Sequence, residues 1–378
     1  MTELLNRELL ALDPHDPQRY LDMAKETEGC ISFTIGEPDF GISDVVNTNV
    51  TKALQLGLTH YAPTTGDPGM RLSVAEFEKR SLGIDYASNE VIMTVGATEA
   101  LAVALLGVLC PGDEVVIPRP CISLYETLVR LGGGTPVFLD TTDDDFQISA
   151  EKLAAAITDK TKAIVLNSPN NPTGVALTAA SMQNVHDAVA GKPIFVICDN
   201  VYNRVVYDGP VPFFASFTDL KKQILVAQSF SNTYAMAGFR AGYLLGEASV
   251  IEKLIPLHKA LVYAPVNFIQ PSCIQAVHAD YMGMVWAYDS RRKFLCERLE
   301  QMGLEFVAPQ GGFFVFPSIK KFGLDSETFC TRLIKEQQLA VLPGICFGSD
   351  DHVRISYSVP MGNLRAGLIR LEKFLQSL

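Results

Sequence analysis

The segment AIVLNSPNNPTG, residues 163–174, shows the plan of this chain most clearly. Its first residues form a short apolar run, which is typical of a strand buried on both faces in a parallel sheet. The loop that follows combines two prolines, which fix the backbone, with three asparagines, whose amides offer directed hydrogen bonds. Open α/β sheets bind ligands beyond the carboxyl ends of their strands, so this loop is a candidate binding element.

The same pattern extends in both directions from this segment. Short β-branched runs alternate with helical stretches from about residue 85 to 246, as in βαβ units. We expect seven strands, at 91–95, 114–118, 136–139, 163–167, 194–198, 224–228 and 241–245, and helices at 98–109, 124–131, 150–157 and 179–190. The last strand follows its neighbour without a helix and can be antiparallel. The predicted fold class is α/β, with a seven-stranded, mainly parallel sheet flanked by helices in a large domain.

A smaller α+β domain is expected from the two ends of the chain. Beyond residue 291 we predict a helix, a short strand pair at 304–308 and 313–316, another helix, a strand at 353–358 and a helix at 363–378. The predicted division is an N-terminal segment, 1–50, that joins the small domain, a large domain at 51–285 and a small C-terminal domain at 286–378.

Composition excludes several classes of protein. With 378 residues, 48% of them apolar and 19% charged, the chain is long and apolar enough to form a folded core. A net charge of -11 without a dense Lys/Arg run argues against a nucleic-acid partner. No window approaches 18 uncharged apolar residues, and the eight cysteines include no C-x-x-C pair, so we expect no membrane span, no metal site and a cytoplasmic location.

Two further segments follow predicted strands and carry anion-binding groups. In TVGATEALAVALL, residues 94–106, a strand ends at Gly96 and a helix starts with Ala97 and Thr98, which suits an anion at a helix N-terminus, although a plain capped turn has the same pattern. SFSNTYAMAGFRAGY, residues 229–243, begins with Ser229 and places Arg240 beside glycines. Hydroxyls and a guanidinium that meet at one point would bind a phosphate.

A carboxylate ends another apolar strand, in FVICDNVYNRVVY. Asp199 is costly to bury unless it meets a cation or an N–H donor, and Tyr202 follows three residues later. All these groups come after strands of one sheet, so we expect them at one edge of it. A phosphate cradle together with a carboxylate for a ring nitrogen is the requirement of pyridoxal phosphate.

In this order the motifs resemble the class I/II aminotransferases, which are fold type I pyridoxal-phosphate enzymes. The resemblance runs from IGEPDF at 35–40, through HYAPTTG, GATEAL, the N-N-P-T-G loop, D-x-x-Y and SFS-x-x-YAM-x-G-x-R, to VRISYS at 353–358. It implies an enzyme that moves an amino group between an amino acid and a 2-oxo acid with pyridoxal 5'-phosphate as cofactor.

The resemblance also implies roles for individual residues. Asp199 would contact the pyridine nitrogen, and Asn171 and Tyr202 the phenolic oxygen of the cofactor. Arg354, with Gly36 and Asn171, would hold the substrate carboxylate. Gly96, Ala97, Thr98, Ser229 and Arg240 would hold the phosphate. Tyr61 would reach the phosphate of a neighbouring subunit, which implies a homodimer with shared active sites.

Two residues depart from the family pattern. Asn232 stands where the family has its Schiff-base lysine, and an amide can neither form that bond nor act as general base. We therefore expect the cofactor to be held non-covalently or as an external aldimine, in a chain impaired by a Lys-to-Asn change; an engineered change is our first interpretation and a natural one the alternative. Ile122 stands where an aromatic ring would stack on the pyridine.

Two other functions are compatible with these motifs. A C–S β-elimination lyase of the same fold would use the same cofactor contacts. A non-catalytic protein that binds pyridoxal phosphate or its aldimine would explain Asn232 as a native residue. The side chain of the amino-acid substrate is not indicated by any motif.

Overall fold

Seven strands form the central sheet of the computed structural model, which describes residues 6–10, 12 and 15–378. Their order is β2-β8-β7-β6-β5-β3-β4. Strands β3 to β7 pair in parallel, whereas β8 is antiparallel to both β7 and β2. The predicted α/β class and the antiparallel last strand are confirmed. The strands are β2 (Val91–Thr94), β3 (Glu114–Arg119), β4 (Thr135–Asp140), β5 (Thr161–Asn167), β6 (Phe195–Asp199), β7 (Ile224–Ser229) and β8 (Gly242–Leu245).

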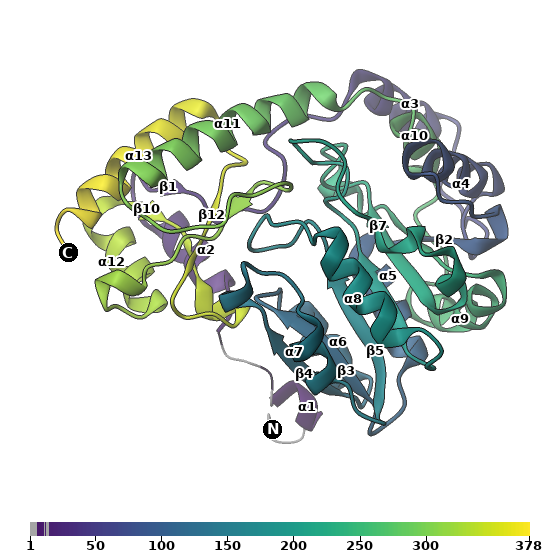
Figure 1. Ribbon diagram of the computed structural model, residues 1–378. Coiled ribbons are helices and arrows are strands. Elements are labelled where there is room, and N and C mark those ends of the chain that lie inside the picture. The colour runs from purple at the N-terminus through teal and green to yellow at the C-terminus, as the bar shows by residue number, and fades with distance from the viewer. Residues whose placement is uncertain (1–5, 11, 13–14) are drawn as a thin grey trace.

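Helices cover both faces of this sheet (Figure 1). The four predicted helices occur within two residues of their expected ends, and side-chain caps start two of them: Ser149 accepts from the Lys152 amide and Thr178 from the Ser181 amide. No helix in the described part of the chain is both long and apolar enough to cross a membrane. The helices are α5 (Gly96–Val108), α6 (Leu124–Leu131), α7 (Ala150–Ala156), α8 (Ala179–Val189) and α9 (Ala248–Val262).

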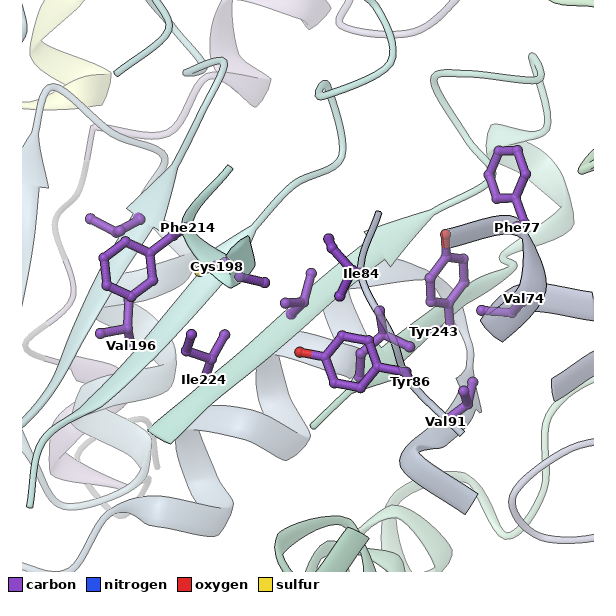
Figure 2. Packing of buried hydrophobic residues seen from close by; sticks show 14 of the residues in the cluster. Val74, Phe77, Ile84, Tyr86, Val91, Val196, Cys198, Phe214, Ile224 and Tyr243 are labelled. Carbon is purple, nitrogen blue, oxygen red and sulfur yellow. The ribbon is translucent and has the colours of Figure 1, made fainter. Parts of the chain in front are cut away.

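Strand β6 shows why the sheet is apolar on both sides. Val196 and Cys198 belong to one buried cluster, which Figure 2 shows together with Tyr86 and Tyr243, whereas Ile197 between them belongs to a cluster on the opposite face. Successive side chains of a strand point to opposite faces, so a strand between two helical layers needs an unbroken apolar run. This is the pattern that the sequence shows.

A second group of helices packs beyond β2, at one edge of the sheet. Helix α10 contacts α3 and α4, and α4 contacts β2. The bounds are α3 (Asp44–Gln55), α4 (Pro68–Leu82) and α10 (Gln270–Ala276).

The smaller lobe is built from both ends of the chain. Strand β1 (Ile31–Ser32) pairs in parallel with β10 (Leu339–Ala340), while β12 (Val353–Ser356) lies between β9 (Phe314–Val315) and β11 (Leu342–Pro343). Its helices are α2 (Gln18–Glu26), α11 (Met282–Gln301), α12 (Ser326–Gln337) and α13 (Met361–Leu375); a short helix, α1 (Arg7–Leu10), precedes them. The division at residues 50 and 285 stays a prediction, and residues 1–5, 11, 13 and 14 lie outside the described residues.

The strand predicted at 304–308 is wrong. This stretch has no strand, and β9 pairs with β12 instead. An apolar run predicts a strand only where a neighbouring strand is available, and a contact as distant as that between β9 and β12 cannot be read from local pattern.

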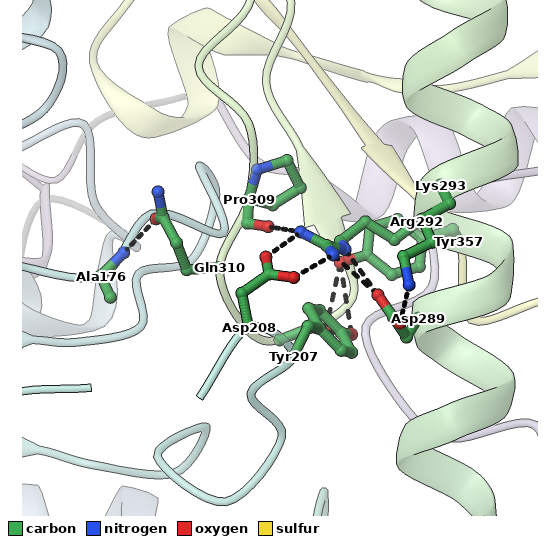
Figure 3. Close-up of polar contacts among 10 residues, drawn as sticks. Ala176, Tyr207, Asp208, Asp289, Arg292, Lys293, Pro309, Gln310 and Tyr357 are labelled. Carbon is green, nitrogen blue, oxygen red and sulfur yellow. Dashed lines mark hydrogen bonds and ion pairs between the residues drawn. The ribbon is translucent and has the colours of Figure 1, made fainter. Parts of the chain in front are cut away.

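An arginine of α11 ties the two lobes together (Figure 3). Both terminal nitrogens of Arg292 contact the Asp208 carboxylate, at 2.7 and 3.0 Å, and Nη1 also donates to the Pro309 carbonyl. The hydroxyl of Tyr207 donates to the Gly312 carbonyl. The loop that follows β6 is thereby attached to the small lobe.

Replacing the fully buried Ile197 by alanine is expected to destabilise the protein by about 2–5 kcal/mol, because a cavity would open between β6 and its helices. Urea unfolding followed by circular dichroism measures this change. The control is Ile369→Ala, at a side chain that is 64% exposed, which we expect to change stability by less than about 0.5 kcal/mol. Equal effects of the two substitutions would contradict the two-layer packing.

Candidate functional site

Neighbouring strands end in polar residues at one edge of the sheet. Asn167 ends β5 and is directly opposite Asp199, which ends β6, and the side-chain Nδ2 of Asn167 donates to the main-chain carbonyl of Asp199 at 3.0 Å. Ser229 ends β7 opposite Gly242 of the antiparallel β8. The predicted convergence at the carboxyl edge is therefore present in the strand register.

The turn between β2 and α5 lies against Arg240. Gly96 has a φ of +76°, and a Cβ there would be only 2.8 Å from a terminal nitrogen of Arg240, so glycine allows the guanidinium to approach the turn. Gly242 is equally constrained, because its Cβ would be 2.9 Å from the Ala97 nitrogen. The turn, Ser229 and Arg240 thus lie around one point.

This point suits an anion. Arg240 is exposed, and within the described part of the chain its guanidinium donates to the carbonyl of Ala237, a neutral acceptor, at 3.1 Å. Thr98, in the first turn of α5, is also exposed. A guanidinium with free N–H groups beside a helix N-terminus and a serine hydroxyl matches the donor set that a phosphate monoester requires.

Asp199 is a buried carboxylate held by neutral donors. It is 3% exposed; the Tyr125 hydroxyl donates to Oδ2 at 2.6 Å and the Val201 amide to Oδ1 at 3.4 Å. Burial raises the pKa of Asp199 to about 6, although these hydrogen bonds oppose the shift. No cation among the described residues pairs with this group, so a protonated ring nitrogen would supply the missing charge.

Polar side chains lie in a row from Arg354 to Asn232. Nη1 of Arg354 donates to Oδ1 of Asn171 at 2.9 Å, and the side chains of Asn171 and Asn232 both lie close enough to the Tyr202 hydroxyl to favour its ionised form. Burial raises the pKa of Tyr202 well above its usual value, so this phenol stays neutral near pH 7. The structure therefore brings two predicted cofactor residues, Asn171 and Tyr202, together with the predicted catalytic position, Asn232, and the predicted substrate arginine.

Arg354 differs from the other buried arginines of the described chain. Each of the others pairs with a carboxylate: Arg204 with Glu78, Arg291 with Asp39 and Arg292 with Asp208. Arg354 donates only to neutral oxygens, including the Thr34 carbonyl at 2.5 Å, and its Nε has no partner. Burial lowers the pKa of Arg354 to about 10. An unpaired buried guanidinium is the natural binding group for a carboxylate.

A cleft of about 370 Å³ opens beside Arg354. Gly36 lies on its wall, where a Cβ would be 3.1 Å from the Phe314 ring and 3.9 Å from Arg354. Ile122, predicted next to the cofactor ring, also lines this cleft. The remaining lining residues are Pro17, Leu21, Thr34, Ile35, Glu37, Ser123, Leu342, Cys346 and Phe347.

Tyr61 lies on the surface of the protein. Its side chain is 80% exposed, and its ring packs 4.7 Å from that of Tyr263. The sequence also gave no sign of two groups that hold the site, the Tyr125 hydroxyl and the Thr34 carbonyl. A phenol donor and a main-chain acceptor carry no recognisable spacing relative to the residues they bind.

Comparison with known proteins agrees with this geometry. A family model described as aminotransferase class I and II matches residues 28–371. The chain is 35% identical to aromatic-amino-acid aminotransferase 2 of Thermococcus litoralis, over 98% of each chain, and 35% identical to an aspartate aminotransferase of Pyrococcus abyssi, over 97% of this chain and 96% of that protein. The crystal structure of an aromatic aminotransferase from Pyrococcus horikoshii superposes with a TM-score of 0.89 at 34% identity, covering 95% of this chain and 99% of that one.

The raised pKa of Asp199 predicts a pH dependence of stability in the protein without cofactor. Between its unfolded pKa of 3.8 and its folded pKa of about 6, the folded state binds the proton more tightly than the unfolded state. Stability should therefore fall as the pH rises through this window, by about 3 kcal/mol.

Urea unfolding at intervals between about pH 4 and about pH 6.5 measures this change. Asp199→Asn is the matched control, because the amide oxygen can still accept from Tyr125 but does not titrate. We expect a flatter profile for this variant. Parallel profiles for the two proteins would show that Asp199 does not titrate in this range.

Proposed function

Because this chain belongs to the class I and II aminotransferase family, whose members depend on pyridoxal phosphate, we propose that it binds this cofactor without a covalent link and that Asn232 blocks or severely slows amino-group transfer. The observation that carries the proposal is the identity of the buried side chain beside Tyr202. Asn232 is 7% exposed there, whereas no lysine in the described chain is buried. The described residues thus place no buried amine at this position.

The residues of the site have separate binding tasks in this proposal. The bound cofactor supplies an electron sink for the bonds at the α-carbon of an amino acid. The turn at Gly96, Ser229 and Arg240 would hold its phosphate, and Asp199 would keep its ring nitrogen protonated. Arg354 would orient the substrate through its α-carboxylate.

Proton transfer is the task that this chain cannot perform at position 232. An amide does not titrate near neutral pH, and the neighbouring Tyr202 stays protonated because burial raises its pKa. A bound amino acid would thus be held in place without a base to move its α-proton. The absence of a base at position 232 supports slow or absent turnover with ligand binding intact. The alternative function that Asn232 favours is a non-catalytic protein that binds pyridoxal phosphate or its aldimine.

We also propose a homodimer, which is typical of the family. Tyr61 and Tyr263 pack together while 80% and 50% exposed, and Leu261 nearby on α9 is 45% exposed. Adjacent exposed apolar side chains favour a protein contact. A location in the cytoplasm stays a prediction from the sequence.

The substrate is proposed to be an amino acid with an uncharged, mostly apolar side chain. Arg354 is the one basic side chain lining the cleft within the described residues, and it would be used by the α-carboxylate. Ile35, Ile122 and Phe347 supply apolar surface, while Glu37 would repel a second carboxylate. An acidic substrate has no partner in this cleft.

Replacing Asn232 by lysine is expected to restore function, because the amine regains both covalent attachment and proton transfer. Borohydride treatment with pyridoxal phosphate should then link the cofactor permanently to the protein, which mass spectrometry detects. Amino-group transfer to a 2-oxo acid should appear as well. Asn232→Gln is the matched control, since it adds length without an amine.

Failure of Asn232→Lys in both measurements would contradict the proposal. Release of pyruvate and ammonia from a cysteine-type substrate, with no amino transfer, would assign the chain to the β-elimination lyases instead. Full transfer activity in the unmodified protein would show that Asn232 is no block.

Unreactive carboxylates test the substrate class in the protein loaded with pyridoxal phosphate. We expect 4-methylpentanoate and 3-phenylpropanoate to bind at least about tenfold more tightly than succinate, because each buried methylene contributes about 0.8 kcal/mol. Titration calorimetry measures the three affinities. Arg354→Gln should weaken all three, and Ile35→Lys should selectively improve succinate. Tighter binding of succinate to the unmodified protein would refute the assignment.

A further inference from the structure

A buried ion pair lies directly behind the phosphate-binding turn. His258 of α9 is fully buried, with Nδ1 at 2.6 Å from Oε1 of Glu99 and Nε2 at 2.6 Å from the Thr64 carbonyl. A carboxylate and a carbonyl can only accept hydrogen bonds, so both contacts form only when both ring nitrogens carry hydrogen. With Glu99 ionised, the geometry therefore requires an imidazolium ion.

Glu99 connects His258 to the turn between β2 and α5. Its second oxygen, Oε2, accepts from the Val95 amide at 2.6 Å, and Val95 immediately precedes Gly96. Glu99 itself lies in the first turn of α5, next to Thr98. The carboxylate thus bridges His258 and the backbone that leads into Gly96, the residue that Arg240 approaches.

Thr64 lies on the segment that carries Tyr61. The carbonyl of the next residue, Thr65, accepts from the Met93 amide at 3.0 Å, which anchors this segment to β2 as well. Tyr61 packs on Tyr263, the residue that directly follows α9. His258 is therefore connected through Glu99 to the turn proposed to bind phosphate. Its other ring nitrogen bonds to the segment that carries Tyr61, which is proposed to reach the partner subunit.

We propose that His258, as an imidazolium ion, is a positioning residue that holds the phosphate-binding turn and the Tyr61 segment in one arrangement, so that its protonation controls affinity for the phosphorylated cofactor. The inference rests on the proposed cofactor binding and adds a regulation to it. Loss of the proton leaves a neutral ring with one N–H, which can serve either Glu99 or Thr64 but not both.

The surroundings of His258 indicate the direction of the pH effect. Burial alone would lower the pKa of His258, but the Glu99 carboxylate raises it above its usual value. Among the described residues, few other charged groups pack against α9. Strand β2 has no titratable side chain, and Glu90, which directly precedes β2, is paired with Lys221. On α9 itself, Lys259 lies over the Tyr263 ring. The contribution of the His258 imidazolium to holding the turn is complete below about pH 6.5, and it is lost as the pH rises through the raised pKa of His258.

The test measures the affinity of pyridoxamine phosphate, which needs no lysine, by titration calorimetry from about pH 6 to about pH 9. His258→Gln should bind about tenfold more weakly than the unmodified protein at the acid end, and the two affinities should converge as the pH rises. Protonation of the ligand phosphate is common to both proteins and cancels in their ratio. A ratio that stays constant with pH would overturn the proposal.

His352→Gln is the matched control. His352 is also buried, at 9% exposed, but its ring stacks on Phe316, away from the turn, so this variant should follow the unmodified protein. Glu99→Gln keeps the size of the side chain and should reproduce the loss in His258→Gln, which protects the test against a folding defect in one variant.

A second measurement needs no ligand. The hydrogen-exchange protection of the Val95 amide in the unmodified protein should fall as His258 deprotonates, and should be low at all pH values in His258→Gln. If pyridoxamine phosphate does not bind at any pH, the proposed function is wrong, while Val95 protection still decides the role of His258. Unchanged protection across the pH range would refute that role.

Discussion

The site depends on two opposite charges that are buried without a charged partner. Asp199 is held by a phenol and an amide, and Arg354 by an amide oxygen and a carbonyl. Neutral hydrogen bonds lower the cost of burying a charge but do not neutralise it. A ligand with a cationic ring nitrogen and a carboxylate satisfies both ends at once. The remaining buried arginines of the described chain have their own carboxylates, so this unbalanced state is confined to the site.

The fold brings this arrangement about through the sheet. Strands β5, β6 and β7 end at nearly the same level, and their last residues are polar although the strands themselves are apolar. The small lobe then supplies Arg354 from β12 and the Thr34 carbonyl from the segment after β1. The ion pair between Arg292 and Asp208 attaches the loop after β6 to this lobe (Figure 3). Binding groups from distant parts of the chain thus lie on the sheet and on the small lobe, which are joined by this ion pair.

Under the proposed function, Asn232 changes the chemistry of the site without removing polar contacts from it. Its side chain lies beside the Tyr202 hydroxyl and near Asn171, which accepts from Arg354. A buried polar group among apolar neighbours would destabilise the fold, whereas this one has polar side chains around it. The same residue would therefore be compatible with a stable protein and incompatible with proton transfer.

The sequence by itself determined the strands of the sheet, its helices and the order of the polar loops, because periodicity and the residues that end each strand are local properties. It also singled out Asp199, Asn171, Arg240 and Arg354 through motif order. Only the tertiary structure decided that Tyr125 donates to Asp199, that His258 joins Glu99 to Thr64, and that β9 pairs with β12 rather than with residues 304–308. These contacts join residues far apart in the chain, and no short-range pattern records which distant partner satisfies a buried polar group.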